Sequence, residues 1–142
     1  MTTFPRQEIE QAWKQRMYLQ DTNDWEGFGN TFTEDAVYVE HHYGIFRGRK
    51  EILAWLVPVM EHCRDWTFPV EWVNIDANRV VHKWWNRLPG QRSDGSYYEF
   101  AGITVMEYAG NGRFSFQEDV YNRYETDKVL EEWSAASKMS AQ

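Results

Sequence analysis

The second half of the chain is dominated by extended segments, and these limit the possible fold more than any other feature. Short turn sequences at residues 76–78, 89–90 and 110–112 divide them. Extended segments joined by such turns pair as neighbouring antiparallel strands. The sequence therefore predicts a meander of four strands, approximately Trp66 to Asp76, Arg79 to Leu88, Tyr97 to Tyr108 and Arg113 to Tyr124.

The first half has mainly helical patterns. Apolar residues at helical spacing follow Pro5, which suits the first turn of a helix. A short second helix, capped by Asp24, is predicted to include Phe28 and Phe32 and to end in a turn at residues 33–35. After this turn, Val37 and Val39 alternate with Tyr38 and Glu40, as side chains do along a β-strand. We therefore expect two helices before the first strand.

Two more helices complete the pattern. Gly48 precedes a third helix, in which Pro58 is expected to cause a kink or an early end, and a final helix is predicted at residues 127–136. Helices first and a strand meander afterwards are typical of an α+β fold. We expect a cone-shaped, curved antiparallel sheet wrapped around the N-terminal helices, enclosing a pocket. Because no linker or repeat interrupts the 142 residues, they are predicted to form one domain, residues 1–142.

Charge and composition limit the kinds of partner that the chain is expected to bind. The formal net charge is −7, which argues against nucleic acid, because that affinity comes from clustered Lys and Arg. No apolar run approaches the roughly 20 residues of a membrane span. The first residues lack the features of a signal peptide, so a cytoplasmic location is expected. Eight Trp, eight Tyr and eight Phe suit either a bulky core or a pocket for a flat hydrophobic ligand.

Proton-handling side chains mark a candidate site at the end of the first strand. Glu40, His41 and His42 follow one another there. Alternation places other polar side chains in rows, because every second residue of a strand shares a face. Periodicity alone does not decide which face points into a cavity. The two rows are His82 with Trp84 and Asn86, and Ser115 with Gln117, Asp119 and Tyr121.

The stretch from Asn23 to Glu40 resembles the nuclear-transport-factor-2-like superfamily, which includes ketosteroid isomerase, SnoaL-like polyketide cyclases, scytalone dehydratase and limonene epoxide hydrolase. The chain length, the order of helices and strands and the turn at residues 110–113 are similar too. The resemblance covers nearly the whole chain and implies the cone-shaped fold. It does not define the reaction, since this superfamily hosts many chemistries and some non-enzymes.

An overlay on ketosteroid isomerase, without gaps from Trp13 to Glu40, implies site residues. The general base of that family falls on Glu40. Its oxyanion-holding tyrosine falls on Arg16 and its protonated aspartic acid on Thr104, and both differences argue against Δ5-steroid isomerisation. The overlay also implies that two sets of side chains line the cavity: His82, Trp84 and Asn86, and Gln117, Asp119 and Tyr121.

A carboxylate and an imidazole in one cavity can exchange protons near neutral pH without a cofactor. We therefore expect a cofactor-independent lyase, either a dehydratase or a C–C-cleaving, deformylating enzyme, acting on a hydrophobic aromatic or polycyclic hydroxylated molecule. No metal is expected, because motifs such as HExxH are missing. The predicted catalytic residues are Glu40, His42, His82 and Asp119, and the predicted substrate-binding residues are Trp13, Arg16, Tyr43, Trp84, Asn86, Thr104, Gln117 and Tyr121.

Other interpretations stay open. The same base would serve an isomerase or a cyclase, which returns the proton to the substrate. An epoxide hydrolase would use Asp119 and Arg16 around a water, and a non-catalytic binding or dimerisation module is a further class. Each residue also has a structural explanation: Glu40 as an ion-paired carboxylate, His82 as a hydrogen-bonded core histidine and Asp119 as the partner of an arginine.

The opposite sheet face is too apolar to remain exposed to water. Such a patch on a small domain predicts a homodimer formed through sheet faces. Its predicted members are Val81, Lys83, Trp85, Ile103, Val105, Phe114, Phe116 and Val120.

Overall fold

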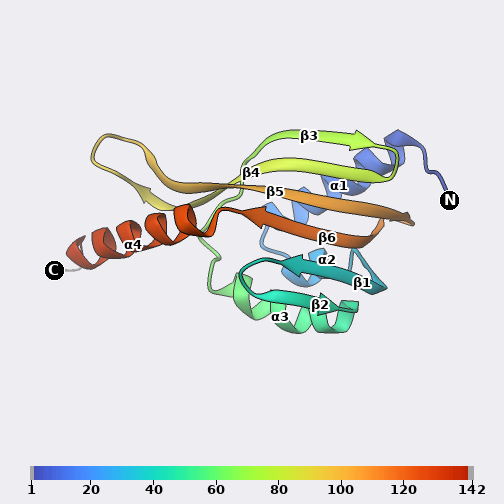
Figure 1. Ribbon diagram of the computed structural model, residues 1–142, viewed down its shortest axis with the longest axis horizontal. Helices are drawn as coiled ribbons and strands as arrows, with labels where there is room; N and C mark the ends of the chain where they lie inside the picture. The colour runs from blue at the N-terminus through green and yellow to red at the C-terminus, as the bar shows by residue number, and fades with distance from the viewer. Residues whose placement is uncertain (1, 141–142) are drawn as a thin grey trace.

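The computed structural model describes residues 2–140, which form four helices and a six-stranded sheet. In chain order the elements are α1 (Arg6–Asp21), α2 (Trp25–Gly29), β1 (Phe32–Glu40), β2 (Gly44–Arg47), α3 (Arg49–Glu61), β3 (Val70–Asp76), β4 (Arg79–Gln91), β5 (Tyr97–Gly110), β6 (Arg113–Tyr121) and α4 (Arg123–Ser140). The strand order is β2-β1-β6-β5-β4-β3. Figure 1 shows α1 and α2 on one side of the sheet and α4 extending from the end of β6.

The predicted α+β fold is confirmed, with one difference in strand direction. β1 and β6 run parallel, so the sheet is mixed rather than wholly antiparallel. Strands joined by a short turn must be antiparallel, but α3 and four strands (β2, β3, β4 and β5) separate β1 from β6 in the chain. Their relative direction is therefore decided by packing and not by a hairpin.

Two local predictions are wrong because tertiary contacts override local preference. Phe32 belongs to β1 and not to a helix, and the turn predicted at residues 33–35 is strand. The ring of Phe32 is fully buried and packs against Phe28 at 6.1 Å between ring centroids. β4 continues through Pro89 and Gly90, so the predicted turn is displaced to residues 92–96, where Arg92 N–H donates to the carbonyl of Ser96.

Element ends also differ from the predictions. The short β2 has no predicted counterpart, and β3 begins at Val70 rather than Trp66. β6 ends at Tyr121, and α4 begins at Arg123, four residues earlier than predicted. α3 does not end at Pro58 but continues to Glu61. Apart from the added β2, the order of elements is as predicted.

A β-bulge in β6 changes which side chains face the core. Phe116 pairs with Glu107 and Phe114 pairs with Tyr108, so two steps along β6 match one step along β5. A bulge of this kind reverses the alternation. Phe114 is therefore fully buried, and its predicted place on the outer face is wrong. Whether the rest of that face binds a second copy stays a prediction.

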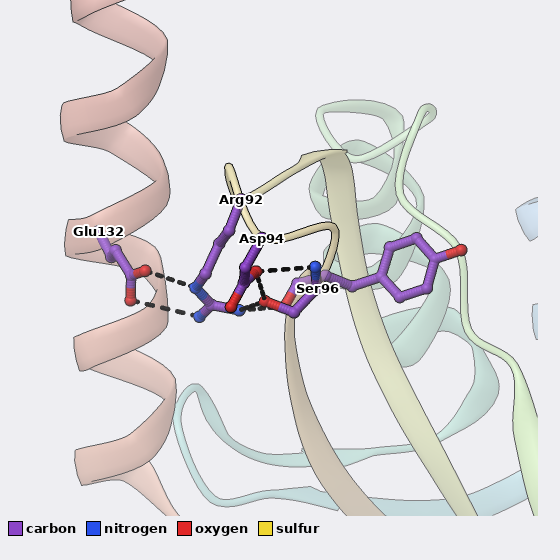
Figure 2. A network of polar contacts seen from close by, with 5 residues as sticks. Arg92, Asp94, Ser96 and Glu132 are labelled. Carbon is purple, nitrogen blue, oxygen red and sulfur yellow. Dashed lines mark hydrogen bonds and ion pairs between the residues drawn. The ribbon is translucent and has the colours of Figure 1, made fainter.

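The long β4–β5 hairpin holds α4 against the end of the sheet. The guanidinium of Arg92 makes two hydrogen bonds to Glu132 of α4, at 2.5 and 3.2 Å (Figure 2). Nε1–H of Trp133 donates to the carbonyl of Pro89 at 2.9 Å.

Among residues 2–140, no helix has the length and apolar character needed to cross a membrane.

Three clusters of buried side chains surround the space left between helices and sheet. The first joins α1 to β3–β6, the second joins α2 and α3 to β1, and the third joins α4 to β4 and β5. Each cluster contributes to the walls of a cavity: Met106 from the first, Tyr38 from the second and Phe100 from the third. Their buried members are Ile9, Ala12, Ile75, Val80, Met106, Tyr108 and Phe114; Trp25, Phe28, Phe32, Ala36, Tyr38, Ile52 and Leu56; and Leu88, Tyr98, Phe100 and Val129.

Candidate active site

The cavity has two adjoining compartments. The inner one has a volume of about 80 Å³ and the outer one about 170 Å³. Tyr38, Trp84 and Asp119 contribute to the walls of both. A flat ligand in the outer compartment would therefore contact the polar groups at the junction.

Strand register brings the polar residues of this junction together. His82 of β4 is opposite Thr104 of β5, Thr104 is opposite Asp119 of β6, and Asp119 is opposite Glu40 of β1. These four residues thus form one row across four strands. Directly opposite side chains are nearest neighbours on a sheet face, so residues far apart in the sequence share one site.

Asp119 accepts hydrogen bonds from three side chains. Tyr38 OH donates to Oδ2 at 2.5 Å, and Thr104 Oγ1–H donates to Oδ1 at 2.8 Å. Gln117 Nε2–H also donates to Oδ1, at 3.0 Å. Trp84 Nε1–H donates to Thr104 Oγ1 at 2.7 Å, which directs the threonine proton to the carboxylate. Burial raises the pKa of Asp119, although all three hydrogen bonds oppose that shift.

Arg16 sets the direction of this network without touching Asp119 directly. Its Nη1–H donates to Oε1 of Gln117 at 2.7 Å, so the amide nitrogen of Gln117 faces Asp119. Arg16 is fully buried, and its guanidinium carbon lies 4.3 Å from the ring centroids of both Phe28 and Phe32. Burial lowers the pKa of Arg16 to about 9. The side chain stays cationic at neutral pH and partly offsets the charge of Asp119.

Glu40 is the carboxylate at the wall of the outer compartment. Its Oε1 accepts hydrogen bonds from Tyr121 OH at 2.8 Å and from the backbone N–H of His42 at 2.7 Å. Within residues 2–140, no hydrogen bond to Oε2 is present. Burial raises the pKa of Glu40, and the negative charge of Asp119 adds to the rise. A carboxyl group with a raised pKa and a free oxygen can serve both as a proton donor and as a proton acceptor.

His82 is nearly buried and uncharged. Its Nδ1 accepts a hydrogen bond from Nε1–H of Trp13 at 2.8 Å. Burial, together with the charge of Arg16, lowers the pKa of His82 to about 3. The ring lines the inner compartment. At neutral pH His82 therefore cannot supply a proton as an imidazolium.

Aromatic and amide side chains complete the outer compartment. Trp84 lies across Gly102, where an added Cβ would stand 2.3 Å from the indole ring, so only glycine leaves room for it. Tyr43 lies at the open side, with its ring 5.6 Å from that of Trp55. Oδ1 of Asn86 is buried and has no hydrogen-bond partner in the described part of the chain. A ligand hydroxyl would satisfy that oxygen.

The cavity collects eleven of the twelve predicted site residues, all except Trp13. Trp13 lies behind His82, and His41 turns away to Glu118, 2.7 Å from its Nε2. Tyr38 is a site residue that the sequence reasoning missed, although it stands two positions before Glu40 on the same strand face. The described residues include no group of three or more His, Cys, Asp and Glu side chains placed to bind a metal ion.

Comparisons with known proteins identify the family from one domain model and the fold from solved structures. The SnoaL-like domain model matches residues 14–116, whereas no curated protein matches. The LEH-like epoxide hydrolase of M. tuberculosis is 16% identical with a TM-score of 0.74, over 94% of this chain and 97% of that chain. A putative SnoaL-like polyketide cyclase from Shewanella putrefaciens CN-32 is 14% identical, with a TM-score of 0.72, over 91% and 88%. A putative ketosteroid isomerase from Kribbella flavida DSM 17836 is 17% identical, with a TM-score of 0.65, over 82% and 79%.

Proposed function

The chain belongs to the SnoaL-like family, within the nuclear-transport-factor-2-like superfamily, and we propose that it is a cofactor-independent lyase for a hydroxylated aromatic small molecule. Solved structures named as a putative ketosteroid isomerase, a putative polyketide cyclase and an epoxide hydrolase share the fold at low identity, so fold alone does not select the reaction. The argument for a lyase comes from the side chains of the cavity.

The observation that carries the proposal is the environment of Glu40. One oxygen is fixed by Tyr121 and by the His42 amide, and burial raises the pKa. A group of this kind serves as an acid in one step and as a base in the next. Aromatic walls, including Trp55, Trp84 and Phe100, suit a flat substrate beside it.

The proposed chemistry needs no redox partner. For a phenol with a benzylic hydroxyl in the para position, protonated Glu40 donates its proton to that hydroxyl, the C–O bond breaks and water leaves. The phenol loses its proton to solvent, and a quinone methide remains. Glu40 carboxylate then removes a proton from the neighbouring carbon, the electron pair returns to the ring, and the phenolate takes a proton from solvent.

A deformylating variant differs only in the second step. Glu40 removes the proton of a hydroxymethyl O–H, the C–C bond breaks, and formaldehyde leaves while the ring regains its electrons. In both variants Glu40 ends protonated, ready for another turnover. Asp119, held by three donors, supplies a fixed negative charge at the junction of the compartments, which favours positive charge developing on the substrate.

An isomerase or cyclase is the second candidate, because a single carboxylate with a raised pKa can also return its proton to the substrate. It differs from a lyase in product mass. An epoxide hydrolase receives less support, because both oxygens of Asp119 already accept hydrogen bonds from protein donors. Asp119 therefore has little capacity left to activate a water.

Mass-resolved incubation tests the proposal. The protein is incubated with phenolic diaryl diols, hydroxylated polycycles, enones and epoxides, beside Glu40→Gln and Asp119→Asn. Glu118→Gln is the matched control, since Glu118 pairs with exposed His41 outside the cavity. We expect loss of water or formaldehyde that falls at least 100-fold in Glu40→Gln and persists in the control.

Other outcomes overturn the lyase in different ways. Unchanged mass with altered retention indicates an isomerase or cyclase, and gain of water indicates a hydrolase. Tight binding without turnover anywhere on the panel indicates a binding module.

A further inference from the structure

His82 and Trp13 together define the tautomer of a buried imidazole. The indole of Trp13 can only donate, and its Nε1–H points to Nδ1 of His82 at 2.8 Å. Nδ1 therefore accepts, and the single proton of the neutral ring must reside on Nε2. The Trp13 ring also packs edge-on against His82, with centroids 5.8 Å apart. Trp13 is thus a positioning residue that acts through His82.

The proton on Nε2 has no acceptor among residues 2–140. His82 is only 5% exposed and lines the inner compartment. A buried N–H group without a partner is costly, so a ligand atom that accepts its hydrogen bond is favoured. The inner compartment therefore offers Nε2–H of His82 as a directed donor.

Most other polar groups of the inner compartment already have partners, although Nη2 of Arg16 is buried without one in the described part of the chain. Thr104 and Tyr38 both donate to Asp119, and Gln117 is held between Arg16 and Asp119. Gln20 lines the compartment too, but it also borders a separate surface cleft. The remaining walls are apolar, formed by Met17, Trp25, Phe28, Leu56, Phe68 and Met106 among others.

We propose that the inner compartment binds an apolar arm of the ligand that ends in a hydrogen-bond acceptor oxygen, and that Nε2–H of His82 donates to that oxygen. A carbonyl, ether or phenolate oxygen fits this description, whereas an ammonium or amide N–H group does not. The inference deepens the proposed function by giving one end of the substrate its chemistry. It rests on that function only in taking the cavity as the substrate site.

The first test is the tautomer itself, because it needs no ligand. Nitrogen-15 NMR at neutral pH should show His82 with a protonated Nε2 and an unprotonated Nδ1. In Trp13→Phe the fixed donor is lost, and a mixture of tautomers is expected. Protonation on Nδ1 in the unaltered protein would overturn the proposal.

The second test uses two unreactive ligands of similar shape, 4-acetylbiphenyl and 4-isopropylbiphenyl, with binding followed by tryptophan fluorescence. We expect the acetyl compound to bind roughly five- to tenfold more tightly, as one added hydrogen bond implies. Its binding should also shift the Nε2–H resonance of His82. In His82→Leu the preference should vanish, and in His82→Gln, which keeps an N–H donor, it should partly return.

Failure of this inference can be distinguished from failure of the lyase. Equal affinities for the two biphenyls in the unaltered protein would exclude a directed donor, even if the diols are turned over. A clear preference without any turnover would support the inner site and leave the reaction to be reassigned. Loss of folding in His82→Leu does not affect the comparison of ligands on the unaltered protein.

Discussion

Two networks in this molecule pair an arginine with a carboxylate in opposite surroundings. Inside the cavity wall, Arg16 reaches Asp119 through Gln117; on the surface, Arg92 bonds directly to Glu132 (Figure 2). Burial raises the pKa of Asp119 and lowers that of Arg16 to about 9. The direct hydrogen bond has the reverse effects, lowering the pKa of Glu132 and raising that of Arg92.

The difference shows that surroundings, and not residue type, decide what such a network does. Removing charges from water disfavours the charged forms, even when hydrogen bonds favour them. The surface network therefore serves to attach the β4–β5 hairpin to α4. The buried network keeps two charges that reduce stability, which is typical of sites where protons are moved.

The largest difference between the networks is expected from removing each arginine. Arg16→Met should lower the free energy of unfolding at pH 7 by about 3 kcal/mol, because Asp119 is left buried without its nearby cation and Gln117 loses its donor. Arg92→Met should stay close to the unaltered protein, since exposed pairs contribute little. Urea denaturation measures both. Equal losses in the two variants would contradict the role assigned to burial.

A smaller effect is expected from neutralising the carboxylate. Asp119→Asn should cost about 1–3 kcal/mol, because its N–H₂ group replaces an acceptor among three donors and leaves one of them unpaired. Asp94→Asn in the surface turn is the control, and its thermal midpoint should barely move. A stability for Asp119→Asn above that of the parent would show that the carboxylate was strained rather than satisfied.

The dependence of stability on pH should have opposite signs in the two regions. The folded pKa of Glu40 lies above its ordinary value of 4.5, so from there up to the raised pKa the folded state binds more protons. Its contribution to stability therefore falls as pH rises through that interval. The pKa of Glu132 is lowered, so its contribution is present above 4.5 and is lost as pH falls through the folded pKa.

Denaturation at several pH values separates these contributions. Glu40→Gln should remove part of the fall toward neutral pH, while Asp119, whose pKa is also raised, retains the rest. Glu132→Gln should instead remove part of the loss in acid. Parallel curves for the two variants would refute the assigned directions.

The smallest effect is expected at the hydrogen bond between Tyr121 and Glu40. That bond lowers the pKa of Glu40, so Tyr121→Phe should raise it further, by at most about one unit. Carbon-13 NMR of the Glu40 carboxyl group reports the change directly. Tyr124→Phe is the control, because Tyr124 is 75% exposed and lies outside the cavity. An unmoved Glu40 titration in Tyr121→Phe would sink the prediction.

Local patterns predict much of this fold, and the exceptions have tertiary causes. The periodicities after Pro5 and Gly48 predict α1 and α3 because helical spacing is a property of neighbouring residues. Phe32, Pro89 and Phe114 depart from prediction because long-range pairing and a bulge override local preference. The position of a bulge depends on the partner strand, which a single strand sequence does not specify.

The candidate site follows the same division. Alternation along the strands is enough to group Gln117 with Asp119 and His82 with Trp84, because side chains of a strand repeat every second residue. The same alternation would also have identified Tyr38, which lies two residues before Glu40. It does not predict the tautomer of His82, because that tautomer depends on a donor from another element.

The sequence by itself determined the order of helices and strands, the polar rows of each strand and the resemblance to a superfamily, because each of these is encoded in neighbouring residues. The tertiary structure alone decided that Glu40, Asp119, Thr104 and His82 share one row, since strand register joins segments that are distant in the chain. It also decided the pKa shifts, because removal of a charge from water depends on everything packed around it.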